Sequence, residues 1–135
     1  MSTTPYHILI VDDNPEFVQS LKSLILDVAG SAISEVVVAY NGHDGLELMR
    51  DREFDFVFMD INMPRIDGIS ATRFARYEYG KPEMKIIGIS FNSEFRFKSQ
   101  MIRAGADCYL IKDEIDADKL LEILNINQNN PTIND

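Results

Sequence analysis

The chain has 135 residues, of which 45% are hydrophobic and 26% are charged, and this size and composition predict a single globular domain. The formal net charge of −9 repels phosphate backbones and anionic lipids, so we expect this domain to make no direct contact with nucleic acid or a membrane. The single cysteine, Cys108, excludes an internal disulfide, and together with the lack of a recognisable signal peptide it indicates a reducing cytoplasm.

Five short segments rich in β-branched and aromatic residues alternate with segments in which apolar residues recur every three or four positions. The first kind predicts strands at 7–11, 36–40, 54–59, 85–90 and 108–112. The second kind predicts helices at about 15–30, 41–51, 70–79, 93–105 and 116–126. Strands joined by such long crossovers pair in parallel and are covered by helices on both faces, so we expect an α/β, doubly wound (βα)5 fold.

The end of the chain differs from the rest. Residues 127–135 are polar and have no apolar helical face. A segment of this kind cannot bury enough apolar surface to fold by itself. We therefore expect one domain over residues 1–126, followed by a polar tail or the start of a linker at 127–135.

Four of the predicted strands lead into polar side chains. Asp12 and Asp13 follow the first strand, Asp60 follows the third, and Ser90 and Lys112 end the fourth and fifth. Because ligands of open parallel sheets bind beyond the carboxyl ends of the strands, we expect these side chains to meet in one site. The alternative, a set of solvated loop charges, gives no reason for their shared position at strand ends.

The chemistry of these side chains favours phosphoryl transfer. Three clustered carboxylates repel one another, and a hard divalent cation such as Mg²⁺ or Mn²⁺ relieves the repulsion through oxygen ligation. Asp60 ends the most aromatic strand and is the candidate carboxylate nucleophile. The metal and Lys112 would neutralise a transferred phosphoryl group, and Ser90 would donate a hydrogen bond to one of its oxygens.

The same residues carry a family resemblance. They are Val11 to Asp13, the segment from Met59 to Pro64 with Asp67 and Gly68 after it, Ser90 and Lys112. With these residues at these spacings, the chain resembles the receiver domain of bacterial two-component response regulators over about residues 6–126. The resemblance implies a flavodoxin-like sheet of order 2-1-3-4-5. It also implies a phosphoacceptor domain rather than an enzyme, one that supports its own phosphorylation and dephosphorylation.

The resemblance assigns roles to the acidic residues. Asp60 would be the phosphoacceptor, which takes its phosphoryl group from the phosphohistidine of a partner. Asp13, Asp60 and the backbone carbonyl of Asn62 would be ligands of Mg²⁺, and Asp12 would hold a metal-bound water. These roles make the metal site and the phosphorylation site one place.

The resemblance also implies a switch and a set of partners. Lys112 would pair with phosphorylated Asp60, and Ser90 and Tyr109 would report phosphorylation to a surface around the fourth helix, fifth strand and fifth helix. The upstream partner would be a sensor histidine kinase or a histidine phosphotransfer protein. Downstream we expect an output domain or protein, with a phosphorylation-dependent homodimer as one form of the response.

Phe91 departs from the family pattern, because the position after Ser90 is small in most receivers. A bulky apolar ring beside Asp60 would obstruct a hydrolytic water, so Phe91 is a candidate gate that predicts slow self-dephosphorylation. The alternative is that Phe91 turns outward and joins Phe95 and Phe97 in a docking patch.

Two further departures concern the backbone. Asp113 stands where a proline with a cis peptide bond usually follows the lysine, and a cis bond costs about 3 kcal/mol without proline, so we expect the 112–113 peptide to be trans. The loop at 30–34 is expected to be slightly longer than usual.

Other functions remain as alternatives. A hydrolase with an aspartyl-phosphate intermediate commonly has a second acid two residues after the nucleophile, where this chain has Asn62. A flavin- or nucleotide-binding module would place glycine-rich backbone donors after the first strand, where this chain has Asp12 and Asp13. Within the receiver family, a phosphorelay intermediate and a degenerate receiver that acts by protein contact alone stay open.

Overall fold

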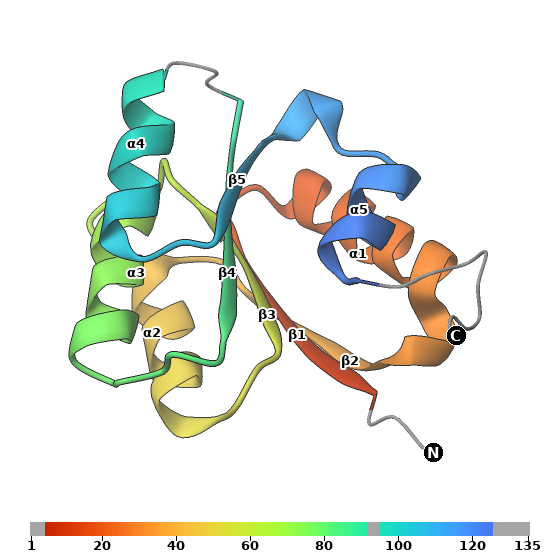
Figure 1. Cartoon of the computed structure of the whole chain (residues 1–135), viewed down its shortest axis with the longest axis horizontal. Helices are drawn as coiled ribbons and strands as arrows, with labels where there is room; N and C mark the ends of the chain where they lie inside the picture. The colour runs from red at the N-terminus through yellow and green to blue at the C-terminus, as the bar shows by residue number, and fades with distance from the viewer. Residues whose placement is uncertain (1–4, 92–94, 126–135) are drawn as a thin grey trace.

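Five parallel strands form one sheet of order β2-β1-β3-β4-β5 in the computed structural model, which describes residues 5–91 and 95–125 (Figure 1). The strands are β1 (Tyr6–Val11), β2 (Ile33–Ala39), β3 (Phe56–Asp60), β4 (Lys85–Ser90) and β5 (Cys108–Ile111). The helices are α1 (Pro15–Ala29), α2 (Gly42–Asp51), α3 (Gly68–Tyr77), α4 (Phe95–Ala104) and α5 (Ala117–Ile123). The doubly wound α/β fold and its flavodoxin-like strand order are therefore confirmed.

The helices lie on both faces of the sheet. Helices α1 and α5 cover one face, and α2, α3 and α4 cover the other (Figure 1). Strand β3 is buried along its whole length, with Phe56 and Phe58 in the core on the α1 side and Val57 and Met59 in the core on the α2 side. Because β3 also lies between β1 and β4, its last residue, Asp60, stands at the middle of the carboxyl edge of the sheet.

Polar side chains begin the helices. The Asn14 side chain accepts hydrogen bonds from two backbone N–H groups in the first turn of α1, directly before Pro15. Asn41 and Asp67 cap α2 and α3 in the same way. Such caps satisfy N–H groups that have no partner within the helix. The predicted cap of the fourth helix, Ser93, lies outside the described residues.

The largest difference from the expected elements is at β2. The segment expected as a longer loop is a short 3-10 helix (Gly30–Ala32) followed at once by β2, which begins at Ile33. Ile33 pairs with Tyr6, and the register shifts between Tyr6 and His7. This irregular pairing extends the sheet beyond the apolar run that marked the strand. Helix α5 ends at Ile123, three residues before the expected 126.

Arg76 joins several elements at the amino edge of the sheet. From the last turn of α3 it donates to the Lys81 carbonyl at 2.5 Å, the Gly105 carbonyl at 2.8 Å and Asp107 Oδ2 at 2.9 Å. Gly105 has a φ of 120°, and a Cβ there would lie 2.4 Å from Arg76 Cγ, so the close approach requires glycine. Asp107 Oδ2 also accepts from the Ile86 N–H at 2.9 Å, which ties β4 into the same junction.

Candidate functional site

The polar residues at the strand ends meet at the carboxyl edge of the sheet. Asp12 directly follows β1, Asp60 and Ser90 end β3 and β4, and Lys112 directly follows β5. One backbone hydrogen bond, from Asp12 N–H to the Ala39 carbonyl at 3.0 Å, continues the β1–β2 pairing one residue past the strand. Because the strands are hydrogen-bonded up to their carboxyl ends, the Cα positions of these residues are fixed. The expected convergence of the polar residues is therefore present in the structure.

The three carboxylates form one cluster. Asp12, Asp13 and Asp60 each offer an oxygen, and these oxygens lie within 4.8 Å of one another. Asp12 is 0% exposed and Asp60 is 3% exposed, whereas Asp13 lies at the surface. Asp12 Oδ1 accepts a hydrogen bond from the Asn14 N–H at 2.9 Å, which fixes its orientation. Solvent therefore reaches the cluster on the side of Asp13, whereas the carboxylates of Asp12 and Asp60 are desolvated.

Lys112 is the cation of the site, and it lies nearer to Asp12 than to Asp60. Its Nζ is 2.6 Å from Asp12 Oδ2 and 3.5 Å from Asp60 Oδ1. The contact with Asp12 is an ion pair by distance, but among the described residues no donor approaches Oδ2 in the direction of a regular hydrogen bond. The inner oxygen of Asp12 is therefore neutralised by charge and incompletely satisfied as an acceptor, which is costly inside a protein.

The surroundings raise the pKa of Asp60 to about 7. Burial is the largest cause, and the negative charge of Asp12 adds to it. The Lys112 ammonium and the backbone N–H of Asn62, which lies 3.4 Å from Asp60 Oδ1, act in the opposite direction without overcoming it. The structure therefore stores electrostatic repulsion at Asp60, which an added cation would relieve.

The loop from β3 to α3 brings backbone close to Asp60. The Gly68 N–H donates to the Ile61 carbonyl at 3.0 Å and closes the loop. A Cβ at position 68 would lie 2.1 Å from the Asp60 carbonyl oxygen, so only glycine allows this approach. Arg65 takes a left-handed conformation with a φ of 66°. Pro64 and Gly68 are residue types typical of such a tight loop.

Ser90 links the loop to β5 through hydrogen bonds. Its hydroxyl is buried and accepts from the Asn62 side-chain amide at 3.2 Å. Tyr109 is half-buried, and burial raises the pKa of its hydroxyl while its hydrogen bond with Ser90 acts in the opposite direction. Ser90 and Tyr109 are thus in contact, as the switch assignment requires. The side-chain role of Asn62 was not anticipated, since only its backbone carbonyl was assigned a function.

Phe91 lies over the lysine. Its side chain is 57% exposed, and its ring centre is 5.1 Å from Lys112 Nζ. Phe17 of α1 lies on the same ammonium at 4.4 Å. Phe97 packs instead against the core on the α2 side, and the Phe95 side chain lies outside the described residues. The sequence analysis gave Phe17 no part in the site.

The backbone after the lysine follows the expectation from Asp113. Lys112 begins a 3-10 helix (Lys112–Glu114). The described residues contain no cis peptide bond, so the 112–113 bond is trans, as predicted. Asp113 is exposed, and the turn leads directly to the start of α5.

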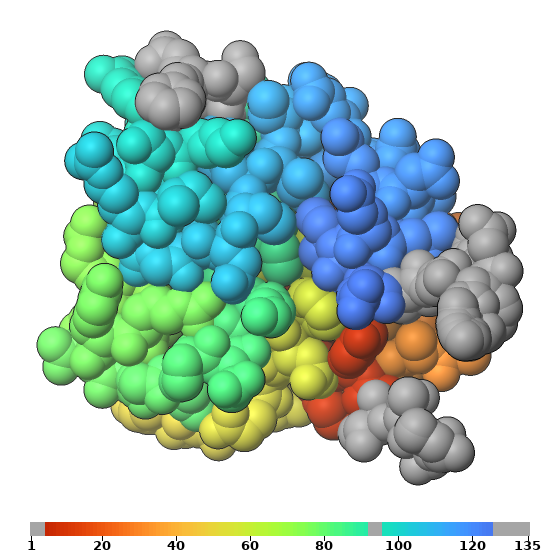
Figure 2. Space-filling view, in the orientation of Figure 1, coloured from red at the N-terminus to blue at the C-terminus, as the bar shows by residue number. Residues whose placement is uncertain are grey.

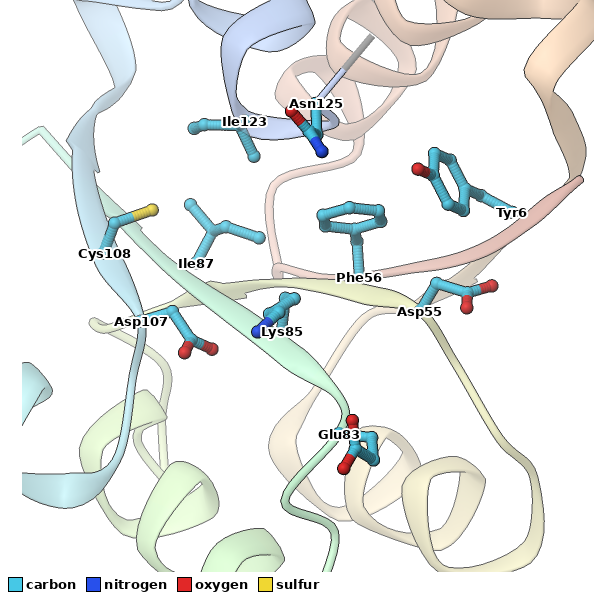
Figure 3. Close-up of a pocket in the computed structure, with 10 residues that line it drawn as sticks. All are labelled: Tyr6, Asp55, Phe56, Glu83, Lys85, Ile87, Asp107, Cys108, Ile123 and Asn125. Carbon is cyan, nitrogen blue, oxygen red and sulfur yellow. The ribbon is translucent and has the colours of Figure 1, made fainter. Parts of the chain in front are cut away.

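A separate cavity of about 340 Å³ lies at the opposite edge of the sheet, near the end of α5. Tyr6, Phe56, Ile87, Cys108 and Ile123 line its apolar part (Figure 3). Burial raises the pKa of the Cys108 thiol to about 11, so this thiol is protonated and unreactive at neutral pH. None of the residues at the carboxyl edge lines this cavity, and it is not part of the acidic site.

Comparison with known proteins gives the family. The model of the response regulator receiver domain matches residues 8–125 of the chain. The chain belongs to this receiver family. Its relatives include the transcriptional regulatory protein DegU of Brevibacillus brevis, which is 32% identical over 88% of this chain. That match covers 48% of DegU, so the receiver corresponds to about half the length of this relative.

Solved receiver domains have the same fold. A CheY-like receiver domain protein from Methanospirillum hungatei superimposes with a TM-score of 0.77 at 27% identity, covering 90% of this chain and 92% of that one. The receiver domain of the sensor histidine kinase PA1611 from Pseudomonas aeruginosa gives 0.76 at 26% identity, covering 90% and 95%. The latter holds a magnesium ion in its active-site cleft. Within the described ranges of our receiver, no helix combines the length and apolar character that crossing a membrane requires.

Proposed function

We propose that Asp60 is the phosphoacceptor of this receiver. It accepts a phosphoryl group from the phosphohistidine of a sensor histidine kinase or of a histidine phosphotransfer protein. The observation that supports this most directly is the position of Asp60, at the middle of the carboxyl edge with Asp12, Asp13 and Lys112 around it. In the transfer, a carboxylate oxygen of Asp60 bonds to phosphorus as the bond from phosphorus to the histidine nitrogen breaks, and the nitrogen keeps the electron pair.

The donor set fits a divalent cation. Carboxylate and carbonyl oxygens are the ligands that Mg²⁺ and Mn²⁺ take, and Asp13, Asp60 and the Asn62 carbonyl would supply them. Asp12, whose buried Oδ2 is incompletely satisfied, would hold a metal-bound water. When bound, the cation supplies positive charge that makes a phosphorylated carboxylate tolerable in this cluster. The magnesium in the related receiver supports the same assignment.

The chain's own residues position and neutralise the phosphoryl group. Lys112 is 3.5 Å from Asp60 Oδ1 and would pair with a phosphoryl oxygen. Ser90, at the end of the neighbouring strand β4, would donate its hydroxyl proton to another phosphoryl oxygen. The Asn62 amide donates to the Ser90 oxygen, which leaves the hydroxyl proton available for this bond. Asn62 has no acidic proton to offer, and this disfavours the hydrolase alternative.

Ser90 and Tyr109 would carry the signal to the surface. They share a hydrogen bond, so a movement of Ser90 toward Asp60 would break this bond. Figure 2 shows parts of α4, β5 and α5 exposed on one face of the molecule. We propose this face as the phosphorylation-dependent contact for an output domain, a downstream protein or a second receiver. The domain would extend over residues 1–126 and act in the cytoplasm, which suits the unpaired Cys108.

The place of Phe91 favours a phosphoryl group that persists. The ring lies 5.1 Å from Lys112 Nζ, which is itself 3.5 Å from Asp60 Oδ1. From there it would obstruct the approach of a hydrolytic water to the phosphorus. Slow loss of the group suits a phosphorelay intermediate, which must keep it until the next carrier arrives. A relay role is therefore the second candidate function, and we regard the domain as a phosphoacceptor and not as an enzyme with turnover.

Intact-mass spectrometry after incubation with an acyl phosphate and Mg²⁺ tests the proposal. We expect one phosphoryl adduct on the wild type, none on Asp60→Asn, and an undiminished adduct on Asp27→Asn, which changes an exposed carboxylate on α1. A chelator should abolish the adduct. Equal labelling of Asp60→Asn would refute the assignment of Asp60, and a wild type that takes up nothing would favour the degenerate receiver.

A further inference from the structure

Two aromatic rings from different parts of the chain enclose the ammonium of Lys112. Its Nζ lies 4.4 Å from the ring centre of Phe17 in the first turns of α1 and 5.1 Å from that of Phe91 after β4. The two rings meet edge to face, with centres 6.3 Å apart and planes at 68°. The lysine side chain is only 5% exposed. Carboxylates and aromatic rings, not water, therefore form most of its surroundings.

The two rings stabilise a buried ammonium that has few short contacts with oxygen atoms. The group has three N–H donors, but only the contact with Asp12 is short, at 2.6 Å, and Asp60 stands at 3.5 Å. The face of an aromatic ring carries partial negative charge and attracts a cation without fixing its direction. A ring can thus keep the ammonium inside the site while the ammonium changes carboxylate partners. A directed hydrogen bond would hold it to one partner.

We propose that Phe17 is a positioning residue that acts through Lys112. Its ring keeps the ammonium in the acidic pocket, so that the ammonium can move from Asp12 to a phosphoryl group on Asp60. The proposal rests on the proposed function of Asp60.

Phe17 is better placed for this role than Phe91. It is nearer to Nζ, it is partly buried against the core on the α1 side, and its backbone N–H donates to the Asn14 cap at 3.2 Å. These contacts anchor the ring on a rigid helix. Phe91 is 57% exposed and follows a strand end. Its ring lies on the same ammonium, and its backbone directly follows Ser90, the residue expected to move.

A role in positioning differs measurably from a role in packing. Leucine at position 17 keeps an apolar side chain of similar bulk but has no ring face, whereas tyrosine keeps the ring. If Phe17 only packs against the core, Phe17→Leu has the same effect whether or not a lysine stands at 112. If it acts through the ammonium, the effect disappears in Lys112→Met, because methionine has no charge. A double-mutant cycle separates the two cases.

The first experiment needs no phosphorylation. Urea unfolding of the metal-free protein gives the folding equilibrium constant of each variant. We expect Phe17→Leu to lower this constant in both backgrounds. The fold decrease in the wild-type background should be roughly three to ten times the fold decrease in Lys112→Met. Phe74→Leu on α3 is the control, because Phe74 also forms an edge-to-face ring pair, with Tyr79, but lies on the opposite face of the sheet from α1 (Figure 1). Its effect should be the same in both backgrounds.

The second experiment measures the initial rate of Asp60 labelling by an acyl phosphate with Mg²⁺. Phe17→Leu should slow labelling roughly three- to tenfold, and Phe17→Tyr should restore most of the rate. Phe74→Leu should label as the wild type does. In Lys112→Met, adding Phe17→Leu should change nothing further. The comparison of the leucine and tyrosine variants needs no lysine variant, and it decides the matter if Lys112→Met does not fold.

The outcomes are distinguishable from those of the proposed function. Equal effects of Phe17→Leu in both backgrounds, or equal slowing by leucine and tyrosine, would overturn the positioning role while phosphorylation of Asp60 stands. A wild type without any label on Asp60 would overturn the proposed function. In that case, coupling between Phe17 and Lys112 in the urea cycle would still support the contact of ring and ammonium.

Discussion

Replacing Asp60 by asparagine should stabilise the metal-free receiver at alkaline pH. In the folded protein the Asp60 carboxyl has a pKa of about 7, whereas its ordinary value is 3.8. Because each unit of pKa corresponds to about 1.4 kcal/mol, ionising this buried carboxylate costs the folded state about 4 kcal/mol relative to the unfolded chain. Asparagine removes that cost, which is already net of the attraction to Lys112, but its amide needs hydrogen-bond partners in the same buried place. We therefore expect a gain of about 2 to 4 kcal/mol in the free energy of unfolding.

The pH dependence of the gain has a definite sign. A folded-state pKa above the unfolded value means that the folded wild type binds the extra proton between pH 3.8 and pH 7. Below this window Asp60 is protonated in both states, and the variant has no advantage. The wild type loses stability relative to Asp60→Asn as the pH rises through the window, and the full difference is reached above pH 7.

Urea unfolding at several pH values, in a chelator, measures this difference. Asp27→Asn, the exposed control on α1, should show little change at any pH. Saturating Mg²⁺ should stabilise the wild type more than Asp60→Asn and reduce the gap, because only the wild type has the complete set of carboxylates. If Asp60→Asn is no more stable than the wild type at pH 8 without metal, or if its advantage does not shrink toward pH 4, the repulsion at Asp60 has been misjudged.

Three further substitutions have defined outcomes. Lys112→Ala should keep most of the Mg²⁺ affinity, measured by titration, but weaken the response to a beryllofluoride phosphomimic, because in the proposed function the lysine pairs with the phosphoryl oxygens and not with the metal. A loss of Mg²⁺ affinity with an unchanged response would reverse these roles. Gly68→Ala should cost about 3 kcal/mol or more in urea unfolding, since its Cβ would lie 2.1 Å from the Asp60 carbonyl oxygen, and a loss below 1 kcal/mol would mean that the loop relaxes easily. Phe91→Ala should speed the decay of the phosphorylated protein, followed by intact mass, and an unchanged decay rate would exclude the gate.

The fold and the convergence of the site could be predicted from the sequence for a common reason. Strands buried on both faces are continuous apolar runs, so their ends are visible where a charge interrupts the run, as at Asp12 and Asp60. Strands that alternate with helices form a parallel sheet, and the carboxyl ends of parallel strands all lie on one edge of the sheet. β2 is an edge strand with an irregular start, and its first residues, Ile33 and Ser34, lack such a run.

The contacts within the site were less predictable, because they depend on side-chain geometry between distant segments. The resemblance predicted Lys112 opposite phosphorylated Asp60, and without phosphate the ammonium lies nearer Asp12, the more deeply buried carboxylate. Phe17 has the spacing of an ordinary core residue, and nothing in the sequence shows that its ring reaches a lysine at the far end of the chain. The bonds of Arg76 to backbone carbonyls leave no pattern of residue types.

The hydrogen bonds of Arg76 anchor only one end of α4. They hold the helix at its carboxyl end, where the Gly105 carbonyl accepts from Arg76 at 2.8 Å, while the other end follows Ser90 in the chain. A ten-residue helix is about 15 Å long, so a tilt of about 10° about the held end would carry the first turn about 2.5 Å. Exposed residues near the pivot, such as Ile102, would move little, and Arg96 in the first turn would move most. If phosphorylation tilts α4 in this way, a protein that binds only the phosphorylated receiver should contact the first turn of α4 and not the last.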